Sequence, residues 1–440
     1  MTRNLPVFRL LLLTALVSFT GFVSAQNVDL ESFKDLKKKK LFKVNGGISA
    51  NTILYNGNGD AGRAPFTYYV NGSINLKIGE MIDLPFSFNL TNVGGGFNYP
   101  VLPNRLSVHP KYKSVTGHIG DVSMTFSPYT LNGYQFRGAG LDLEPKGALK
   151  ISAMAGQLQR AVEYDSSNRV SLPSYKRFGY GAKVNYVKTN YKVGMIVFAA
   201  KDQVNSLVNK PDSLQILPKQ NLVVSWNGMY MPAKNLELSA EYATSALTRD
   251  LRDTSNVGAT GGNVLKSVYA TRNSTSFYKA IKANLNYKFK NSLVGVGYER
   301  IDPGYQTLGA YYFNNDLENI TVNFAQPFYK EKGHIAANFG YQRDDLDGDK
   351  LGSNSRAVGS VNVDFMPSQK LFLTAGYSNF QTYMYIKPLF QSINQQTQFQ
   401  NVDTLNFSQI SQNANFNANY TFQRSDKKSQ SFNVNISMFD

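Results

Sequence analysis

Residues 66–78 read FTYYVNGSINLKI, and their side chains alternate between apolar and polar. One face of this segment would carry Phe66, Tyr68, Val70, Ile74, Leu76 and Ile78, and the other Thr67, Asn71, Ser73, Asn75 and Lys77. A period of two residues is typical of a β-strand with one apolar and one polar face.

The same alternation recurs along the chain, at residues 236–242, 281–289, 361–365, 415–422 and 432–438. Repeated segments of roughly ten residues with this pattern are typical of a transmembrane β-barrel whose apolar face meets lipid. A soluble β-sandwich or propeller alternates too, but long strands and aromatic residues that close the apolar rows (Phe289, Phe365, Phe422) favour the barrel. We predict an all-β fold: a single antiparallel up-and-down β-barrel of about 18 strands, with 16 as the lower bound.

Turn signals fix the order of the strands. Short polar connections are predicted at 144–147, 188–191, 232–235, 290–292, 329–333, 367–370 and 424–429. Long ones are predicted at 56–63, 163–174, 203–219, 245–275, 302–317, 344–355 and 380–412. These signals give 18 or 19 strands. An odd number of strands cannot return both chain ends to the periplasm, so we expect that one strand between Leu84 and Leu143 is split or merged in this count.

The N-terminus carries a processing signal. Arg3 and Arg9 precede and flank a short apolar core, and Val23-Ser24-Ala25 supplies the small residues that a signal peptidase reads. We predict a cleaved signal peptide over residues 1–25, with Gln26 as the new terminus. A short periplasmic leader (26–41) would then precede the barrel (42–440), and the protein would lie in the outer membrane of a Gram-negative bacterium.

Composition bounds the chemistry. The 440 residues contain no Cys, so a disulfide framework, a thiolate metal site and a lipid-modified cysteine are excluded. The formal net charge is +16, and removal of residues 1–25, with two Arg and no acid, leaves +14. No nucleic-acid-binding motif accompanies this charge. The partners we expect are outer-membrane lipid, lipopolysaccharide phosphates, small solutes and envelope proteins, and not nucleic acid.

Several runs of the chain share a resemblance to a known group of proteins: Pro110–Lys113, Phe126–Leu131 with Arg137-Gly138, Arg343–Lys350, Tyr377–Gln381 and Ile410–Asn415. These runs resemble functionally uncharacterised, porin-like outer-membrane barrels of Bacteroidota. The resemblance spans most of the predicted mature chain. It implies a barrel in the outer membrane, and it supplies no catalytic residues.

Catalytic signals are weak. His118 lies near Asp121 and Ser123, but spacings of three and five residues on a strand place His118 on the face opposite both. We therefore predict that the protein is not an enzyme, with no catalytic residues and no cofactor. Asp345, Asp347 and Asp349 resemble the start of a calcium loop that lacks the later bidentate acid, so a solvated loop is favoured over a weak metal site.

A polar lumen is the remaining functional expectation. Its candidate lining residues are Lys77, Lys282, Asn284, Asn286 and Lys288. Pro128 cannot donate a hydrogen bond to the ladder, so it marks the end of the preceding strand, and the loop with Pro128 and Tyr129 starts there. It is read as a tight connection, or alternatively as a constriction folded into the lumen.

Two functions remain open. The first is a porin-like channel for passive or selective passage of small solutes, with anions favoured by the lysines. The alternative is a structural or accessory barrel subunit of an outer-membrane assembly, such as a secretion or envelope complex. A TonB-dependent transporter is disfavoured, because the first strand is predicted to start near Phe42 and leaves no room for a plug domain.

Overall fold

A computed structural model describes ten stretches of the chain: residues 42–56, 65–79, 81–92, 104–166, 173–209, 215–254, 264–348, 355–385, 406–425 and 428–439. The predicted signal peptide (1–25) and leader (26–41) lie outside the described residues. The first described strand begins at Phe42, where the sequence predicts the barrel to start.

The described residues form one sheet of 20 strands. Two short 3-10 turns, η4 (Val204–Ser206) and η6 (Val264–Ser267), are the helical elements among them. The search of these stretches for a helix long and apolar enough to cross a membrane returned none. In chain order the strands are β1 (Phe42–Leu54), β2 (Phe66–Ile78), β3 (Ile82–Thr91), β4 (Arg105–Val108), β5 (Lys111–Tyr112), β6 (Val115–Thr125), β7 (Asn132–Leu143), β8 (Leu149–Gln159), β9 (Arg177–Val187), β10 (Tyr191–Asp202), β11 (Gln220–Ala233), β12 (Leu236–Thr248), β13 (Thr275–Phe289), β14 (Ser292–Ile301), β15 (Leu317–Phe328), β16 (Gly333–Arg343), β17 (Ser355–Ser368), β18 (Leu371–Tyr385), β19 (Asn406–Ser425) and β20 (Lys428–Phe439).

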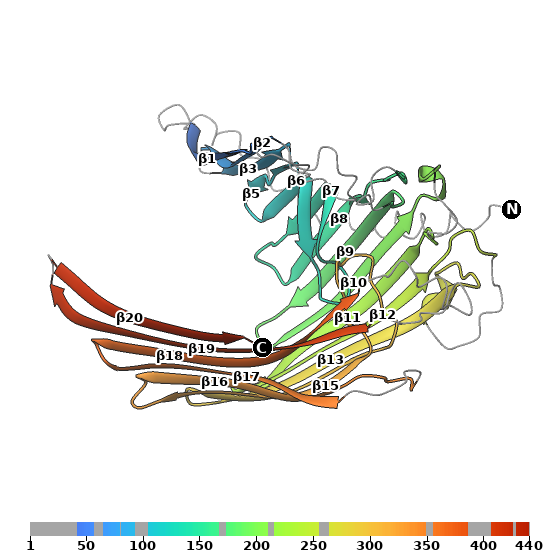
Figure 1. The fold of residues 1–440 in the computed structure, drawn as a ribbon. Coiled ribbons are helices and arrows are strands. Elements are labelled where there is room, and N and C mark those ends of the chain that lie inside the picture. Colours follow the sequence, from blue (N-terminus) through green and yellow to red (C-terminus); the bar gives the residue numbers. More distant parts are fainter. Residues whose placement is uncertain are drawn as a thin grey trace.

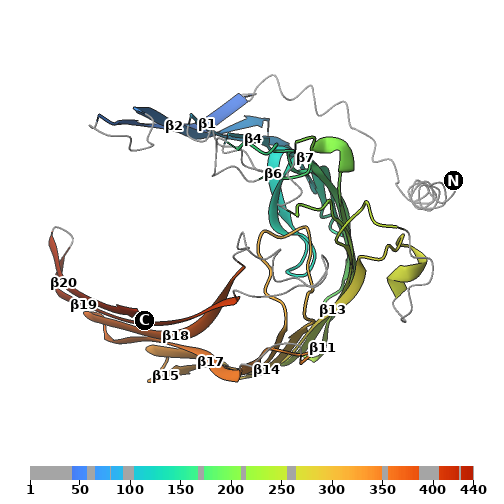
Figure 2. The same cartoon turned by 45° about the vertical axis from the view of Figure 1, so that its right-hand side comes forward.

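All strand pairings are antiparallel, and except for β4 and β5 each strand pairs with its neighbours in the chain, so the predicted all-β, up-and-down architecture is confirmed. The sheet curls strongly about one axis and encloses a concave side (Figures 1 and 2). Among the described residues, β1 pairs only with β2 and β20 pairs only with β19. The two edges of the sheet therefore stand apart.

The strand number differs from the prediction of about 18. β4 and β5 both pair with β3 on one side and with β6 on the other, so they are two halves of one strand. They are separated by His109 and Pro110, and proline has no N–H for the ladder. Counting the two halves as one turns 20 strands into 19 positions in the sheet. The 19 positions exceed the predicted 18 by one, and the broken strand lies between Leu84 and Leu143, where the sequence analysis expected a strand to be split or merged.

The turn prediction holds at most connections, and the exceptions are informative. β12 continues to Thr248, although the sequence places a loop from Ser245 onward. Residues 243–248 read ATSALT and do not alternate, because all six are buried on whichever face they occupy. β18 and β19 likewise extend to Tyr385 and from Asn406, inside the loop predicted over 380–412.

The two faces of the sheet differ in polarity. On the convex face large apolar side chains are exposed, among them Val193 (53%), Leu285 (41%) and Val296 (46%). The concave face is mostly polar, and its buried apolar groups lie where loops cover it. Two clusters of this kind contain Phe126, Leu131 and Phe198, and Tyr129, Ala243 and Tyr305 respectively.

A third apolar cluster lies on the convex face. Leu265 and Tyr269, from the segment between β12 and β13, pack against Val224 and Ala246 of the sheet. This segment lies outside the curve of the sheet in Figure 2. The Tyr269 hydroxyl donates to the backbone oxygen of Gln220 at 3.0 Å. The apolar packing and this hydrogen bond together hold the segment on β11. The end of β12 is thus covered from both sides, which explains why its side chains do not alternate.

Candidate functional site

The concave face carries one continuous row of paired residues across eight strands, β9 to β16. Register pairs link its members from strand to strand: Asn185, Gly194, Asn227, Glu241, Lys282, Glu299, Asn319 and Gln342. Alternation puts these residues on the same face, because paired residues of neighbouring strands point the same way. The row is a polar belt around the inside of the curve.

The charges of the belt face each other. Lys282 lies between Glu241 and Glu299, and its Nζ is 3.9 Å from Glu299 Oε1. Glu241 accepts a hydrogen bond of 2.6 Å from the hydroxyl of Ser225. The centre of the belt therefore combines one ammonium group with two carboxylates, rather than an isolated positive charge.

The sequence-predicted lining residues are placed as follows. Lys282, Asn284, Asn286 and Lys288 alternate along β13 on the concave face. Lys77 is on β2, many strands away, and its Nζ is 3.8 Å from Asp83 of β3. The structure thus brings four of the five predicted lining residues onto one strand and leaves the fifth near the edge of the sheet.

The loop between β6 and β7 folds onto the concave face (Figure 2). Pro128 starts its turn, and Tyr129 is 1% exposed. The Tyr129 hydroxyl donates to Glu299 of the belt. Burial, with the negative charge of Glu299, raises the pKa of Tyr129 well above its usual range, so this hydroxyl remains a donor. Lys183 of β9 donates to the backbone oxygen of Phe126 at 2.6 Å and holds the other end of the loop.

A second loop, between β14 and β15, folds inward beside the first, and the sequence analysis missed it. The Tyr305 hydroxyl donates to the backbone oxygen of Tyr129 at 2.8 Å, and Thr307 donates to that of Thr130 at 2.6 Å. The backbone N–H of Asn132 donates to Gly309 at 2.9 Å. Burial raises the pKa of Tyr305 well above its usual range, so it too stays protonated.

Both inward loops are tied to the wall. Asn221 of β11 is fully buried, and its Oδ1 accepts from the backbone N–H of Leu308 at 3.1 Å. Ser245 of β12 donates to the backbone oxygen of Gln306 at 2.8 Å. The signals that could have indicated this loop are the turn sequence Asp302-Pro303-Gly304 and the aromatic run Tyr311-Tyr312-Phe313 in a long connection.

The histidines form a chain of hydrogen bonds that differs from a hydrolase arrangement. His118 Nε2 lies 2.8 Å from Asp142 Oδ2, and its Nδ1 lies 2.8 Å from Nδ1 of His109. Asp121 instead pairs with Arg137 at 2.7 Å. His118, Asp121 and Ser123 therefore do not come together as a triad.

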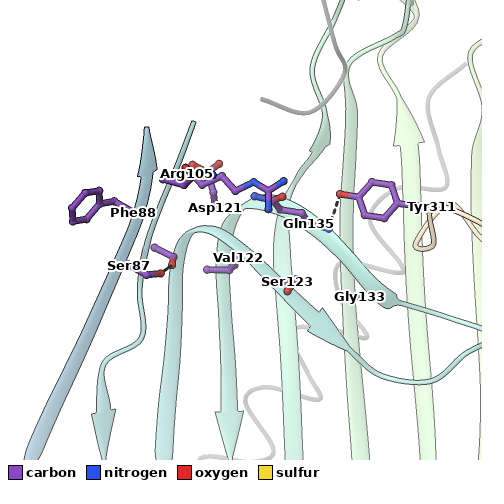
Figure 3. A pocket seen from close by; sticks show the side chains of 11 residues that line it. Ser87, Phe88, Arg105, Asp121, Val122, Ser123, Gly133, Gln135 and Tyr311 are labelled. Carbon is purple, nitrogen blue, oxygen red and sulfur yellow. Dashed lines mark hydrogen bonds between the residues drawn. The ribbon is translucent and has the colours of Figure 1, made fainter. Parts of the chain in front are cut away.

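A polar hollow of about 460 Å³ opens near the end of β6, where β4 is short (Figure 3). Its charged residues are Arg105 and Asp121, both labelled in Figure 3, and Asp121 also accepts from the backbone N–H of Leu106 at 3.2 Å. Tyr311 of the second inward loop forms one wall, and its hydroxyl accepts from the backbone N–H of Gln135 at 3.2 Å. The hydroxyls of Ser87 and Ser107 bond each other at 2.7 Å across two strands of the hollow.

The acidic loop after β16 is held by backbone hydrogen bonds to Asp316, and its carboxylates do not gather into a metal site among the described residues. The backbone N–H groups of Asp345 and Leu346 donate to the carboxylate of Asp316 at 3.0 and 2.8 Å. Asp349, the third residue of the predicted weak metal site, lies outside the described residues. In the stretches that the structure describes, no group of three or more His, Cys, Asp or Glu side chains has a geometry suited to a metal ion.

Comparisons with known proteins return solved structures only. No protein-family model matches the chain, and no curated protein matches it. Pseudomonas aeruginosa OccK8 (OprE) is 12% identical, with a TM-score of 0.40 over 77% of this chain and 92% of that one. Acinetobacter baumannii OccAB3 is 12% identical, with a TM-score of 0.40 over 85% and 92%.

A third structure is Pseudomonas aeruginosa OccK2 (OpdF) in complex with glucuronate, which is 10% identical with a TM-score of 0.37 over 90% and 94%. Because these scores lie below 0.5, the function of this chain has to be inferred from its own geometry. The resemblance to barrels of Bacteroidota stays a prediction.

Proposed function

We propose that the chain is an outer-membrane β-barrel that acts as a porin-like channel for small solutes. The observation that carries this proposal is the contrast between the two faces of one curled sheet. The convex face exposes apolar side chains that water would not favour, and the concave face carries the continuous polar belt from Asn185 to Gln342. A lipid-facing exterior with a polar interior is the arrangement of a transmembrane barrel.

The rim at the short turns supports a membrane setting. Lysine ammonium groups lie over aromatic rings at four of these turns: Lys113 over Tyr112, Lys188 over Tyr186, Lys290 over Phe289 and Lys332 over Tyr329, at 5.1 to 6.0 Å from the ring centres. Aromatic girdles mark membrane interfaces, and lysines beside them reach toward anionic headgroups. We propose that this rim lies at the periplasmic interface.

The inward loops would narrow the path. Tyr129 and Tyr305 pack on the concave side against residues of β11–β15. The Tyr305 hydroxyl bonds the backbone oxygen of Tyr129, the Tyr129 hydroxyl bonds Glu299, and these bonds hold the loops there. Polar side chains and inward-folded loops set selectivity in such channels. We propose that solutes pass beside these loops, along the part of the concave face that the loops leave uncovered.

Charge selectivity in this proposal is a weak preference for anions. Lys77 and Lys282 face the carboxylates of Asp83 and Glu299, so much of their field is balanced locally. Lys288, at the end of β13, is exposed and would contribute most of the remaining positive potential. Fixed positive charge in an aqueous path lowers the entry barrier for anions.

The test is conductance in a planar bilayer. The purified full-length protein is expected to give stable single-channel steps in KCl, with a reversal potential slightly toward anions in a salt gradient. Lys288→Glu should move that potential toward cations, and the shift should shrink as salt rises, because the Debye length falls to about 3 Å near 1 M. A folded protein with no conductance would contradict the channel.

A structural or accessory subunit of an outer-membrane assembly is the second candidate. The observation that favours it is the pair of free edges, since β1 and β20 each have one side without a strand among the described residues. Free edges are templates for pairing with another chain. Mild-detergent extraction that recovers the protein only within a larger complex would favour this function.

We also propose that residues 1–25 are a cleaved signal peptide. N-terminal sequencing of the membrane-extracted protein should begin at Gln26, and recovery of Met1 would contradict it.

A further inference from the structure

We infer that the concave wall of β13–β16 holds a binding groove for an uncharged, polyhydroxylated solute such as a sugar. This inference rests on the proposed channel and names the class of solute that would dwell in it. The groove has a volume of about 280 Å³, close to the lower end of the roughly 300–1,000 Å³ common for ligand sites.

The lining of the groove is dominated by carboxamides. Beside Gly297, the groove is lined by Lys282, Asn284, Tyr298, Glu299, Asn319, Thr321, Asn323 and Asn338. Each Asn offers an N–H donor pair and a carbonyl acceptor, and adjacent hydroxyl groups of a sugar both donate and accept. A wall of four asparagines therefore matches a polyol at several points without requiring any charge on the solute.

The charged groups of the groove already have partners. Lys282 lies 3.9 Å from Glu299, and Glu299 also accepts from the Tyr129 hydroxyl. A charged solute would have to compete with these contacts, and the net charge that Lys282 and Glu299 present together is near zero. The chemistry of the groove therefore favours neutral solutes over anions, in contrast to the weak general preference proposed for the channel as a whole.

The carboxamides are held in position by the sheet. Asn338 donates to Asn323 on the neighbouring strand. Asn284 lies across Gly297, where an added Cβ would come within 3.0 Å of its Oδ1 and 2.5 Å of Thr321 Oγ1. The glycine thus leaves room for Asn284 to lie flat on the wall. Ordered amides lose less side-chain entropy when a ligand binds than mobile ones do.

One acceptor in the groove stands unused within the part of the chain that the structure describes. Oδ1 of Asn319 is buried and has no hydrogen-bond partner among these residues. A buried acceptor without a partner costs free energy, which a donating solute hydroxyl would recover. Asn319 also belongs to the polar belt, where it is the register partner of Glu299.

The wall continues in the same style beyond the groove. Register pairs lead from Asn338 to Ser360 of β17, Ser378 of β18 and Asn413 of β19. All four are uncharged hydrogen-bonding side chains on one face. A solute that leaves the groove therefore meets further neutral donors and acceptors rather than a change of sign.

The experiment is sugar block of the ion current through the full-length protein in a planar bilayer. Glucose is titrated on one side in KCl, and gluconate, an acid of similar size, is titrated in a parallel series. Block is expressed as a fraction of each variant's own open current, so changes in conductance cancel. Glucose should reduce the current saturably and at lower concentration than gluconate.

The test variant carries both Asn284→Leu and Asn319→Leu. These substitutions keep the side-chain volume and remove both amides. Loss of two hydrogen bonds should raise the half-blocking glucose concentration by about tenfold. Asn435→Leu, on the concave face of β20 and outside the groove, is the control and should leave the half-blocking concentration as in the unmodified chain.

The outcomes separate the two proposals. Three outcomes would overturn the sugar groove and leave the channel standing, each in a protein that conducts ions. They are a glucose effect that does not saturate, a stronger block by gluconate than by glucose, and equal half-blocking concentrations in all variants. Absence of conductance in a folded protein would overturn the channel itself.

Discussion

The Tyr129 hydroxyl couples the first inward loop to the wall of the sheet at Glu299. Tyr129 is recognisable in the sequence as a loop residue after Pro128, but its partner Glu299 is 170 residues away. Local sequence patterns carry no information about such a pair, because nothing in the spacing of either residue depends on the other. The sequence therefore indicates that this loop could fold inward, and only the fold identifies what it binds.

Tyr129→Phe should loosen the inward loop. The substitution keeps the ring and removes one hydrogen bond to a carboxylate, a bond worth about 1.5–3 kcal/mol when buried. We expect a lower unfolding midpoint in detergent and a noisier, larger single-channel conductance. Tyr312→Phe is the control, because Tyr312 is 89% exposed. Equal effects of the two substitutions would show that the bond to Glu299 does not hold the loop.

The same bond predicts a pH dependence. Burial and Glu299 raise the pKa of Tyr129 in the folded protein above its unfolded value of about 10. A group with a raised pKa stabilises the folded state fully below its unfolded pKa and loses that contribution as pH rises through the folded one. The stability difference between the unmodified chain and Tyr129→Phe should therefore be constant from neutral pH to about pH 9 and shrink at strongly alkaline pH. A difference that vanished near neutral pH would contradict the assignment.

At the scale of the element, alternation predicts strands well where one face is free. The segment 281–289 alternates and forms the second half of β13. Residues 243–248 belong to β12, but apolar and polar side chains do not alternate there because both faces of the strand are buried. Ala243 packs under the inward loops and Ala246 under the segment that contains Leu265. The end of this strand could not be predicted from its own sequence, because the segments that bury it come from other parts of the chain.

Neighbouring positions of β13 should respond oppositely to a charge. Leu285 is on the apolar convex face, and Asn286 is on the polar concave face. Arginine at mid-depth of a lipid-facing surface costs about 2–4 kcal/mol. Leu285→Arg should therefore reduce the amount of folded barrel in the outer membrane, measured by heat-modifiable migration in gels, far more than Asn286→Arg. The reverse order would mean that the faces are assigned wrongly.

The contact between the two inward loops depends on a glycine. A Cβ at Gly309 would lie 2.7 Å from the backbone oxygen of Thr130 and 2.8 Å from the ring of Phe198. Gly309→Ala should thus push the loops apart and cost about 1–3 kcal/mol, as overpacking does.

The readout for Gly309→Ala is denaturant unfolding, followed through the single tryptophan, Trp226 of β11. Gly147→Ala is the control, since nothing lies within 4 Å of its added Cβ. A midpoint for Gly309→Ala that matched the control would show that the loops are not in close contact at this position.

For the whole molecule, composition and periodicity were enough to predict one antiparallel sheet, and the turn residues predicted most of its connections. The strand number was not predictable in the same way. β4 and β5 are too short to show a period, and the break between them falls at His109 and Pro110. The curvature that brings the second inward loop against the first also depends on the complete sheet rather than on any one segment.

The 19 strand positions have a directional consequence. With one reversal at every connection, the first and nineteenth positions run the same way, so β1 and β20 both run from the short-turn end to the long-loop end. If these edges meet, they must meet in parallel. Because the chain has no cysteine, paired cysteines can report this contact. Val44→Cys should cross-link with Phe432→Cys, near the start of both strands, rather than with Met438→Cys near the end of β20. The opposite preference would require an additional strand, or a slipped seam, between the two ends of the sheet.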